Sequence, residues 1–289
     1  MPSNIQEPDP HTVTIIGCGY VGMAVASHFQ QKPGYFVTAT TTRYERVAEI
    51  EKVATRVVVI KGNDIDGVRS LVQNHHTILL SIAPISDRQV EPDIYEETYI
   101  PTAENIVAAL TNTDQEKQLI YLSSCSVYGN KKGDLVDETA SVTPTDKYAE
   151  IMSKTEQILL QANSKNMRIC VLRLGGIYGP SREFAKRLSR IAGKTLPGSG
   201  EHFVNWIHLD DIVSAVDFIQ ENQCHGIYNL VDNTKLTLRE LCNQVCDLYN
   251  LEKVIWDSSQ PSLRDNNVRV NNQKIKGAGY NLVYPDLLL

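Results

Sequence analysis

The feature that most constrains the fold is an alternation of short β-branched runs with longer helical patterns, which begins at residue 12. Strands that alternate with helices form βαβ units, whose strands are parallel and whose helices cover both faces of one sheet. The sequence therefore predicts an α/β fold with a doubly wound, mostly parallel sheet. Its strands are expected at residues 12–16, 36–40, 56–61, 77–82, 118–123, 168–174 and 226–230, and its helices near 22–31, 43–53, 65–73, 95–112 and 148–163.

The regular alternation of strand-like and helix-like runs ends after Pro180. A helix is expected over residues 182–192, and a second opens at Asp210 and Asp211, whose carboxylates suit the amides and the dipole at a helix N-terminus. A third begins near Thr237, because Thr237-Leu-Arg-Glu240 has the spacing of a capping box. We expect a first domain over residues 1–180 and a smaller substrate lobe over 181–289, which contributes a strand near 226–230 to the sheet.

Composition excludes several classes of partner. The chain has 289 residues, of which 42% are apolar and 21% charged, and its net charge of −6 gives no basic face for nucleic acid or anionic membrane. No apolar run approaches the roughly 18 residues of a membrane span. The six cysteines are dispersed, without the paired spacings of a metal site or a disulfide scaffold. We expect a cytoplasmic protein with reduced thiols, no bound metal and a small-molecule substrate.

A glycine motif stands where the first strand meets the first helix. Residues 12–16 run directly into Gly17-Cys-Gly-Tyr-Val-Gly22, which an apolar helix follows, and in this context the motif predicts a Rossmann-type dinucleotide site. Gly17 would permit the tight turn, Gly19 would let a pyrophosphate approach the backbone, and Gly22 would allow close helix packing. Tyr20 and Val21, within the motif, are expected to contact the same cofactor.

The end of the second strand indicates which dinucleotide binds. An Asp or Glu that accepts from the adenosine ribose is usual there, but this chain has Thr40-Thr-Thr-Arg43. Small hydroxyls followed by a guanidinium suit a 2′-phosphate. The interpretation is that Thr41, Thr42 and Arg43 favour NADP(H), with NAD(H) as an alternative. Arg43 could instead start the next helix and face water.

Several ordered motifs carry a resemblance over nearly the whole chain. It resembles the short-chain dehydrogenase/reductase superfamily, in particular its extended branch of NAD(P)-dependent epimerases and dehydratases. The matching segments are the glycine motif, Ser123-Ser-Cys-Ser-Val-Tyr-Gly129, Asp137-Glu-Thr139 with Pro144 leading to Tyr148, Arg173-Leu-Gly-Gly-Ile-Tyr-Gly-Pro180, and Ile207-His-Leu-Asp-Asp211.

The resemblance implies a catalytic pair. The family's active-site serine falls on Ser124 and its acid/base tyrosine on Tyr148, so Ser124 would hydrogen-bond the substrate oxygen while Tyr148 transfers the proton. The resemblance also implies a homodimer through the helices near 95–112 and 148–163. From the position of strand ends in such sheets, Ala83 and Pro84 could touch the cofactor, and Tyr148 is expected to contact it as well.

One position departs from the family and makes this chain an atypical member. The lysine expected one helical turn after Tyr148 is replaced by Met152. A phenol without such a neighbour ionises near pH 10, which slows general-base oxidation more than it slows protonation of a nascent alkoxide. The sequence therefore favours an oxidoreductase or an epimerase/dehydratase-like enzyme on a small sugar, polyol or carbonyl compound. The alternative is a non-catalytic dinucleotide-binding protein that senses redox state or assists assembly.

Overall fold

The structure is a computed structural model, and it describes residues 9–83, 91–111, 114–262 and 266–289. A seven-stranded sheet forms its centre, in the order β11-β7-β5-β4-β1-β2-β3. The pairs β1–β2, β1–β4, β2–β3 and β4–β5 are parallel. The strands are β1 (His11–Ile16), β2 (Tyr35–Thr41), β3 (Arg56–Val59), β4 (Thr77–Leu80), β5 (Lys117–Ser124), β7 (Met167–Leu174) and β11 (Gly226–Leu230). The predicted α/β fold is therefore confirmed, with every expected strand of the sheet present.

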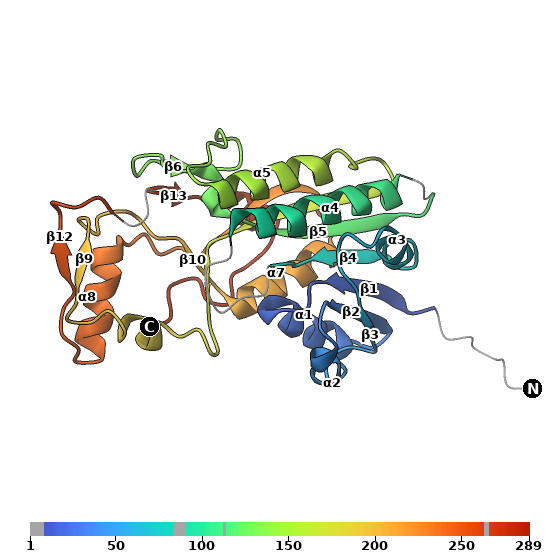
Figure 1. The fold of residues 1–289 in the computed structure, drawn as a ribbon, viewed down its shortest axis with the longest axis horizontal. Coiled ribbons are helices and arrows are strands. Elements are labelled where there is room, and N and C mark those ends of the chain that lie inside the picture. Colours follow the sequence, from blue (N-terminus) through green and yellow to red (C-terminus); the bar gives the residue numbers. More distant parts are fainter. Residues whose placement is uncertain (1–8, 84–90, 112–113, 263–265) are drawn as a thin grey trace, which may run out of the picture. The chain divides into compact units, whose positions relative to one another are not determined.

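The inner strands are buried on both faces. Val13, Ile15, Ile78 and Leu79 are fully buried, and so is Thr14 between two of them. A strand covered on both sides reads as a continuous apolar run instead of an alternating one, which is the pattern of a parallel sheet between two helix layers. In Figure 1, α4 (Pro92–Leu110) lies on one side of the first strands and α1 (Tyr20–Gln30) on the other.

The other helices follow the strands along the chain. They are η1 (Tyr44–Arg46), α2 (Val47–Ile50), α3 (Ile65–Gln73), η2 (Cys125–Tyr128), α5 (Lys147–Leu160), α6 (Phe184–Leu188), α7 (Leu209–Glu221), α8 (Leu238–Leu248) and α9 (Gln273–Gly277). The capping box of α8 is present, because the Thr237 and Glu240 side chains each bind the other residue's backbone amide. None of the helices within the described ranges is long and apolar enough to cross a membrane.

Short parallel pairs lie outside the central sheet. They are β8 (Gly176–Tyr178) with β10 (Trp206–His208), β9 (Thr195–Pro197) with β12 (Ile255–Asp257), and β6 (Leu135–Val136) with β13 (Arg269–Val270). Cys242 is fully buried in the apolar cluster that α8 shares with α6, and burial raises the pKa of its thiol to about 11. This thiol packs as a small apolar side chain.

Two predicted helices are shorter than expected. Over residues 43–53 the chain forms only η1 and α2, and Ile50 is the one fully buried side chain that anchors them. Over residues 182–192 the helix spans only Phe184–Leu188, where two buried side chains one turn apart are the whole apolar face. A helix needs a longer apolar stripe than this to offset its conformational entropy.

The chain divides into two compact units, each assembled from separate segments. The first contains Met1–Tyr121, Thr155–Cys170 and Ile219–Gly226, and the second contains Leu122–Lys154, Val171–Phe218 and Ile227–Leu289. The glycine motif belongs to the first unit, and Ser124 and Tyr148 both belong to the second. The functional boundary near residue 180 stays a prediction.

Candidate active site

The glycine motif forms a tight turn after β1. Gly17 has φ +94°, and a Cβ atom there would lie 2.6 Å from the Ser81 carbonyl oxygen. A Cβ atom on Gly22 would lie 2.5 Å from the Gly17 carbonyl oxygen. Side chains at either position would collide with backbone, so glycine is required at both.

Gly19 differs from the other two glycines because no protein atom packs against it. A Cβ atom there would meet no protein atom within 4 Å, and the residue is the N-cap of α1, where no side chain caps the helix. An open backbone at the N-terminus of an eleven-residue helix suits a phosphate group, through the helix dipole and amide donors. The residues present therefore fit the pyrophosphate of a dinucleotide.

Thr40, at the end of β2, holds this turn in place. Its Oγ1 accepts from the Gly17 amide at 3.0 Å, and its carbonyl accepts from the Cys18 amide at 2.9 Å. The Cys18 side chain is buried, which raises the pKa of its thiol to about 12 and keeps it protonated. The turn is thus fixed by the neighbouring strand and carries no reactive thiolate.

The predicted 2′-phosphate residues lie beyond Thr40. Thr41 is buried and accepts from the Arg43 amide at 3.2 Å, whereas Thr42 and Arg43 are exposed. The Arg43 Nε lies 3.6 Å from Glu45 Oε1, an exposed pair of the kind that contributes little to stability. The guanidinium is therefore accessible to an anion, with Glu45 as a competitor.

Arg46 is a residue that sequence reasoning missed. Its Nη1 donates to the Cys18 carbonyl at 2.7 Å, and its Nε donates to Glu49 at 3.1 Å. The arginine thus joins the segment after β2 to the glycine turn and brings a guanidinium to that turn. No local pattern marks this contact, because its two residues are 28 positions apart.

Two further predicted cofactor contacts follow β4. Ala83 is exposed, after Ile82, whose carbonyl accepts from the Tyr99 hydroxyl at 2.8 Å. Pro84 lies outside the described residues.

The predicted cofactor contacts Tyr20 and Val21 occupy the first turn of α1, where Val21 is buried.

Ser124 is the last residue of β5 and is half-buried. Its Oγ accepts from the Ser126 amide at 3.1 Å and so caps η2. A hydroxyl that accepts in this way keeps its own proton for donation to another oxygen. Two further hydrogen bonds fix η2. Cys125 Sγ donates to the Arg173 carbonyl at 3.2 Å, and the Tyr128 hydroxyl donates to Asn229 Oδ1 at 2.8 Å.

Tyr148 stands in the first turn of α5 and is half-buried. Met152, one turn later on the same face, is half-buried as well. Lys147 is exposed and pairs with Glu150 at 3.0 Å, and Lys154 is exposed too. Neither lysine therefore takes the position that Met152 occupies.

His208 is structural in this arrangement. It is 5% exposed, its Nδ1 accepts from the Asp210 amide at 3.2 Å, and its ring lies 4.2 Å from that of Tyr284. No group of three or more His, Cys, Asp or Glu side chains in the described part of the chain could hold a metal ion.

The chain matches a family model and a relative along its length. A model of the NAD dependent epimerase/dehydratase family matches residues 13–230. Protein YeeZ of Escherichia coli (strain K12) is 27% identical over 288 residues, which cover 96% of this chain and 97% of that protein.

Solved structures share the fold. A functionally unknown conserved protein from Silicibacter pomeroyi superposes with a TM-score of 0.75 at 23% identity, covering 96% of this chain and 95% of that one. The UDP-glucose 4-epimerase of Thermus thermophilus, solved with NAD, gives a TM-score of 0.76 at 18% identity and covers 94% of both chains. At these identities the likeness is one of fold.

Proposed function

The chain belongs to the NAD-dependent epimerase/dehydratase family, and we propose that it is an NADP(H)-preferring enzyme that interconverts carbonyl and hydroxyl groups on a small sugar, polyol or carbonyl compound. One observation supports the direction of the reaction. Met152 replaces the expected lysine one turn after Tyr148, on the half-buried face of α5. The site is therefore better suited to carbonyl reduction than to oxidation.

Two hydroxyl groups, those of Ser124 and Tyr148, act on the substrate oxygen. The dinucleotide, when bound, supplies or accepts the hydride. Ser124, whose Oγ accepts from the Ser126 amide, donates its hydroxyl proton in a hydrogen bond to the substrate's carbonyl oxygen and so polarises the C=O bond. Tyr148 gives its phenolic proton to the same oxygen as carbon accepts hydride, which yields the hydroxyl product. A neutral phenol is already the acid that this step requires, so reduction needs no neighbouring cation.

The preference for NADP(H) is proposed from the end of β2. Thr42 and Arg43 are exposed there, no acid stands among residues 40–43, and Arg46 brings a guanidinium to the glycine turn. Guanidinium groups bind phosphate bidentately, and a carboxylate at this place would repel it.

Calorimetry on the Arg43→Ala variant tests this preference. The variant should bind NADPH at least tenfold more weakly, because one charge-assisted contact is lost. Its affinity for NADH should stay within about twofold, since NADH has no 2′-phosphate. An equal loss for both dinucleotides would contradict a role in recognising the 2′-phosphate.

A screen of small carbonyl compounds with NADPH tests the activity. Once a substrate is found, Tyr148→Phe should reduce kcat at least 100-fold, within the range that a general acid contributes, while the affinity for NADPH stays unchanged. Met152→Lys should accelerate the reverse oxidation at pH 7 at least tenfold and move its pH profile to lower pH. Both effects follow from a cation that stabilises the phenolate.

Two control variants separate charge from packing. Met152→Leu keeps an apolar side chain of similar volume and should leave both directions unchanged. Lys154→Ala removes an exposed lysine of α5 and should have no effect, because Lys154 does not share the face of Tyr148. Full activity in Tyr148→Phe would refute the mechanism.

Met152 also favours a second candidate function. A chain that keeps the glycine turn but has no lysine beside its tyrosine could bind dinucleotide without turnover, as a redox sensor or an assembly partner. In that case NADPH would bind, no carbonyl compound would be reduced, and Tyr148→Phe would not change the protein's effect in cells. A dimer through the helices near 95–112 and 148–163 is proposed for either function.

A further inference from the structure

The loop after β11 carries a lysine whose amino group is held by the backbone. Lys235 Nζ donates to the Val270 carbonyl at 3.0 Å and reaches the Asp232 carbonyl at 3.5 Å. The residue as a whole is exposed, whereas both of these contacts are half-buried. The amino group therefore has a defined position at the boundary between protein and solvent.

Two carbonyl acceptors suit an uncharged amine. A neutral lysine has two N–H donors and one lone pair, whereas an ammonium has three donors and no lone pair. When the two donors of neutral Lys235 bind the carbonyls of Val270 and Asp232, the lone pair points away from both oxygens. The amine is then oriented for attack on a carbon atom from the solvent side.

The surroundings of Lys235 favour this uncharged form. Burial is the largest cause that lowers the pKa of its amino group. Four titratable groups act on it besides: the acids Asp232 and Cys125, which raise the pKa, and the cations Lys276 and Arg269, which lower it. Desolvation and neighbouring cations are two means by which a lysine becomes nucleophilic near neutral pH.

Hydrogen bonds hold both neighbouring cations in place. Lys276 Nζ donates to Oδ1 of Asn233, which belongs to the same loop as Lys235. Arg269 Nε donates to the Gly133 carbonyl at 2.7 Å. Their positive charge therefore acts on Lys235 from fixed positions, where it disfavours the ammonium form and attracts an approaching anion.

We propose that Lys235 is a modification site that takes an acyl group from an acyl phosphate. The amine lone pair attacks the acyl carbon and forms a C–N bond. The C–O bond to phosphate breaks, phosphate leaves with its electron pair, and the amine proton passes to solvent. The product is a neutral amide, so Lys235 no longer adds a positive charge beside Lys276 and Arg269. The phosphoryl group of the donor is attracted by these two cations, which favours an acyl phosphate over an uncharged acyl donor. The site does not depend on the function proposed above.

Acetylation of the full chain, followed by peptide mass spectrometry, tests the site. The probes are acetyl phosphate, which is an anion, and acetic anhydride, which is uncharged. At pH 8, acetyl phosphate should acetylate Lys235 at least tenfold faster than the exposed lysines Lys52 and Lys194, since each unit by which the pKa of a lysine falls gives about tenfold more neutral amine. With acetic anhydride the advantage of Lys235 should be smaller, because that reagent carries no charge.

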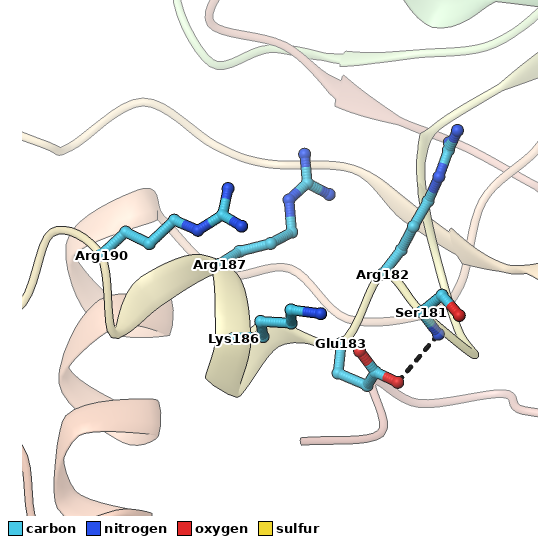
Figure 2. A pocket seen from close by; sticks show the side chains of 6 residues that line it. All are labelled: Ser181, Arg182, Glu183, Lys186, Arg187 and Arg190. Carbon is cyan, nitrogen blue, oxygen red and sulfur yellow. Dashed lines mark hydrogen bonds between the residues drawn. The ribbon is translucent and has the colours of Figure 1, made fainter. Parts of the chain in front are cut away.

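Lys186 is a stricter comparison than these two lysines. It is exposed, and it lines a pocket of α6 and the preceding loop together with Arg182, Arg187 and Arg190, as Figure 2 shows. If neighbouring arginines alone made a lysine reactive, Lys186 would be acetylated as fast as Lys235. We expect Lys186 to react at the rate of Lys52.

Two variants of Lys276 test the part played by the neighbouring charge. Lys276→Gln should slow the reaction of Lys235 with acetyl phosphate several-fold more than its reaction with acetic anhydride, since only acetyl phosphate is attracted by the cation. Lys276→Arg keeps the charge and should retain the wild-type rates. Far-ultraviolet circular dichroism checks that each variant is folded.

Two results would overturn the site. One is acetylation of Lys235 by acetyl phosphate that is no faster than that of Lys52 or Lys186, which the wild-type chain alone can show. The other is a loss of rate in Lys276→Gln that is equal for the two reagents or absent. Failure of the proposed function looks different, because it is the absence of NADPH binding or turnover, and neither acetylation rate depends on these.

Discussion

Asp232, two residues after the end of β11, is the acid whose replacement should change stability most clearly. It is 1% exposed, and its Oδ1 accepts from the Thr234 amide at 2.9 Å. Its Oδ2 has no hydrogen-bond partner among the described residues. A buried carboxylate with one oxygen unsatisfied is costly to ionise, so Asp232→Asn should remove that cost.

The size of the expected change in unfolding free energy follows from the pKa of the Asp232 carboxyl. Burial raises it from 3.8 to about 7, and the nearby carboxylates of Asp286 and Asp211 add to this, while the Thr234 amide and Lys235 oppose it. The folded state therefore holds the proton more tightly than the unfolded state. This contribution to stability is complete below about pH 4 and is lost as the pH rises through about 7. Between pH 5 and pH 7 it amounts to roughly 3 kcal/mol, at about 1.4 kcal/mol per pH unit.

Urea denaturation at pH 5 and pH 8 measures the effect. The difference in unfolding free energy between Asp232→Asn and the wild-type chain should shift in favour of the variant by roughly 3 kcal/mol from pH 5 to pH 8. Any cost of the new amide group is the same at both pH values and cancels. Asp66→Asn, at an exposed acid on α3, is the control. An unchanged difference at the two pH values would refute the argument that Asp232 titrates near neutrality.

Two other substitutions test the local geometry. Thr40→Val removes the acceptor of the Gly17 amide and should weaken NADPH binding about tenfold by calorimetry, since one hydrogen bond that fixes the turn is lost; an unchanged affinity would show that the turn holds its shape without it. Thr237→Ala breaks the capping box with Glu240 and should lower the unfolding free energy by about 1 kcal/mol in urea; a loss near zero would mean that packing alone fixes the start of α8.

The fold was predictable because its determinants are local. A buried parallel strand is a continuous apolar run, and a glycine turn between a strand and a helix needs glycine at fixed spacing, as Gly17 and Gly22 show. The pairs β8–β10, β9–β12 and β6–β13 were not predicted, because strands of two or three residues carry no periodicity. Their pairing depends on segments distant in the sequence.

The resemblance to the family selected Ser124 and Tyr148 as candidates, and their catalytic roles stay predictions. It did not show that Ser124 Oγ also caps η2. The contact of Arg46 with the Cys18 carbonyl depends on η1 and the glycine turn meeting in space.

Both proposed functions require the glycine turn to bind a nicotinamide dinucleotide, and the enzyme is proposed to prefer the phosphorylated form. Calorimetric titration of the purified chain with NADPH, NADH, NADP and NAD tests this binding most directly. We expect one site per chain, with NADPH bound at least tenfold more tightly than NADH, because Arg43 is exposed after β2, Arg46 contacts the glycine turn, and residues 40–43 include no acid. Absence of binding for all four dinucleotides would contradict both proposed functions and leave only the fold established.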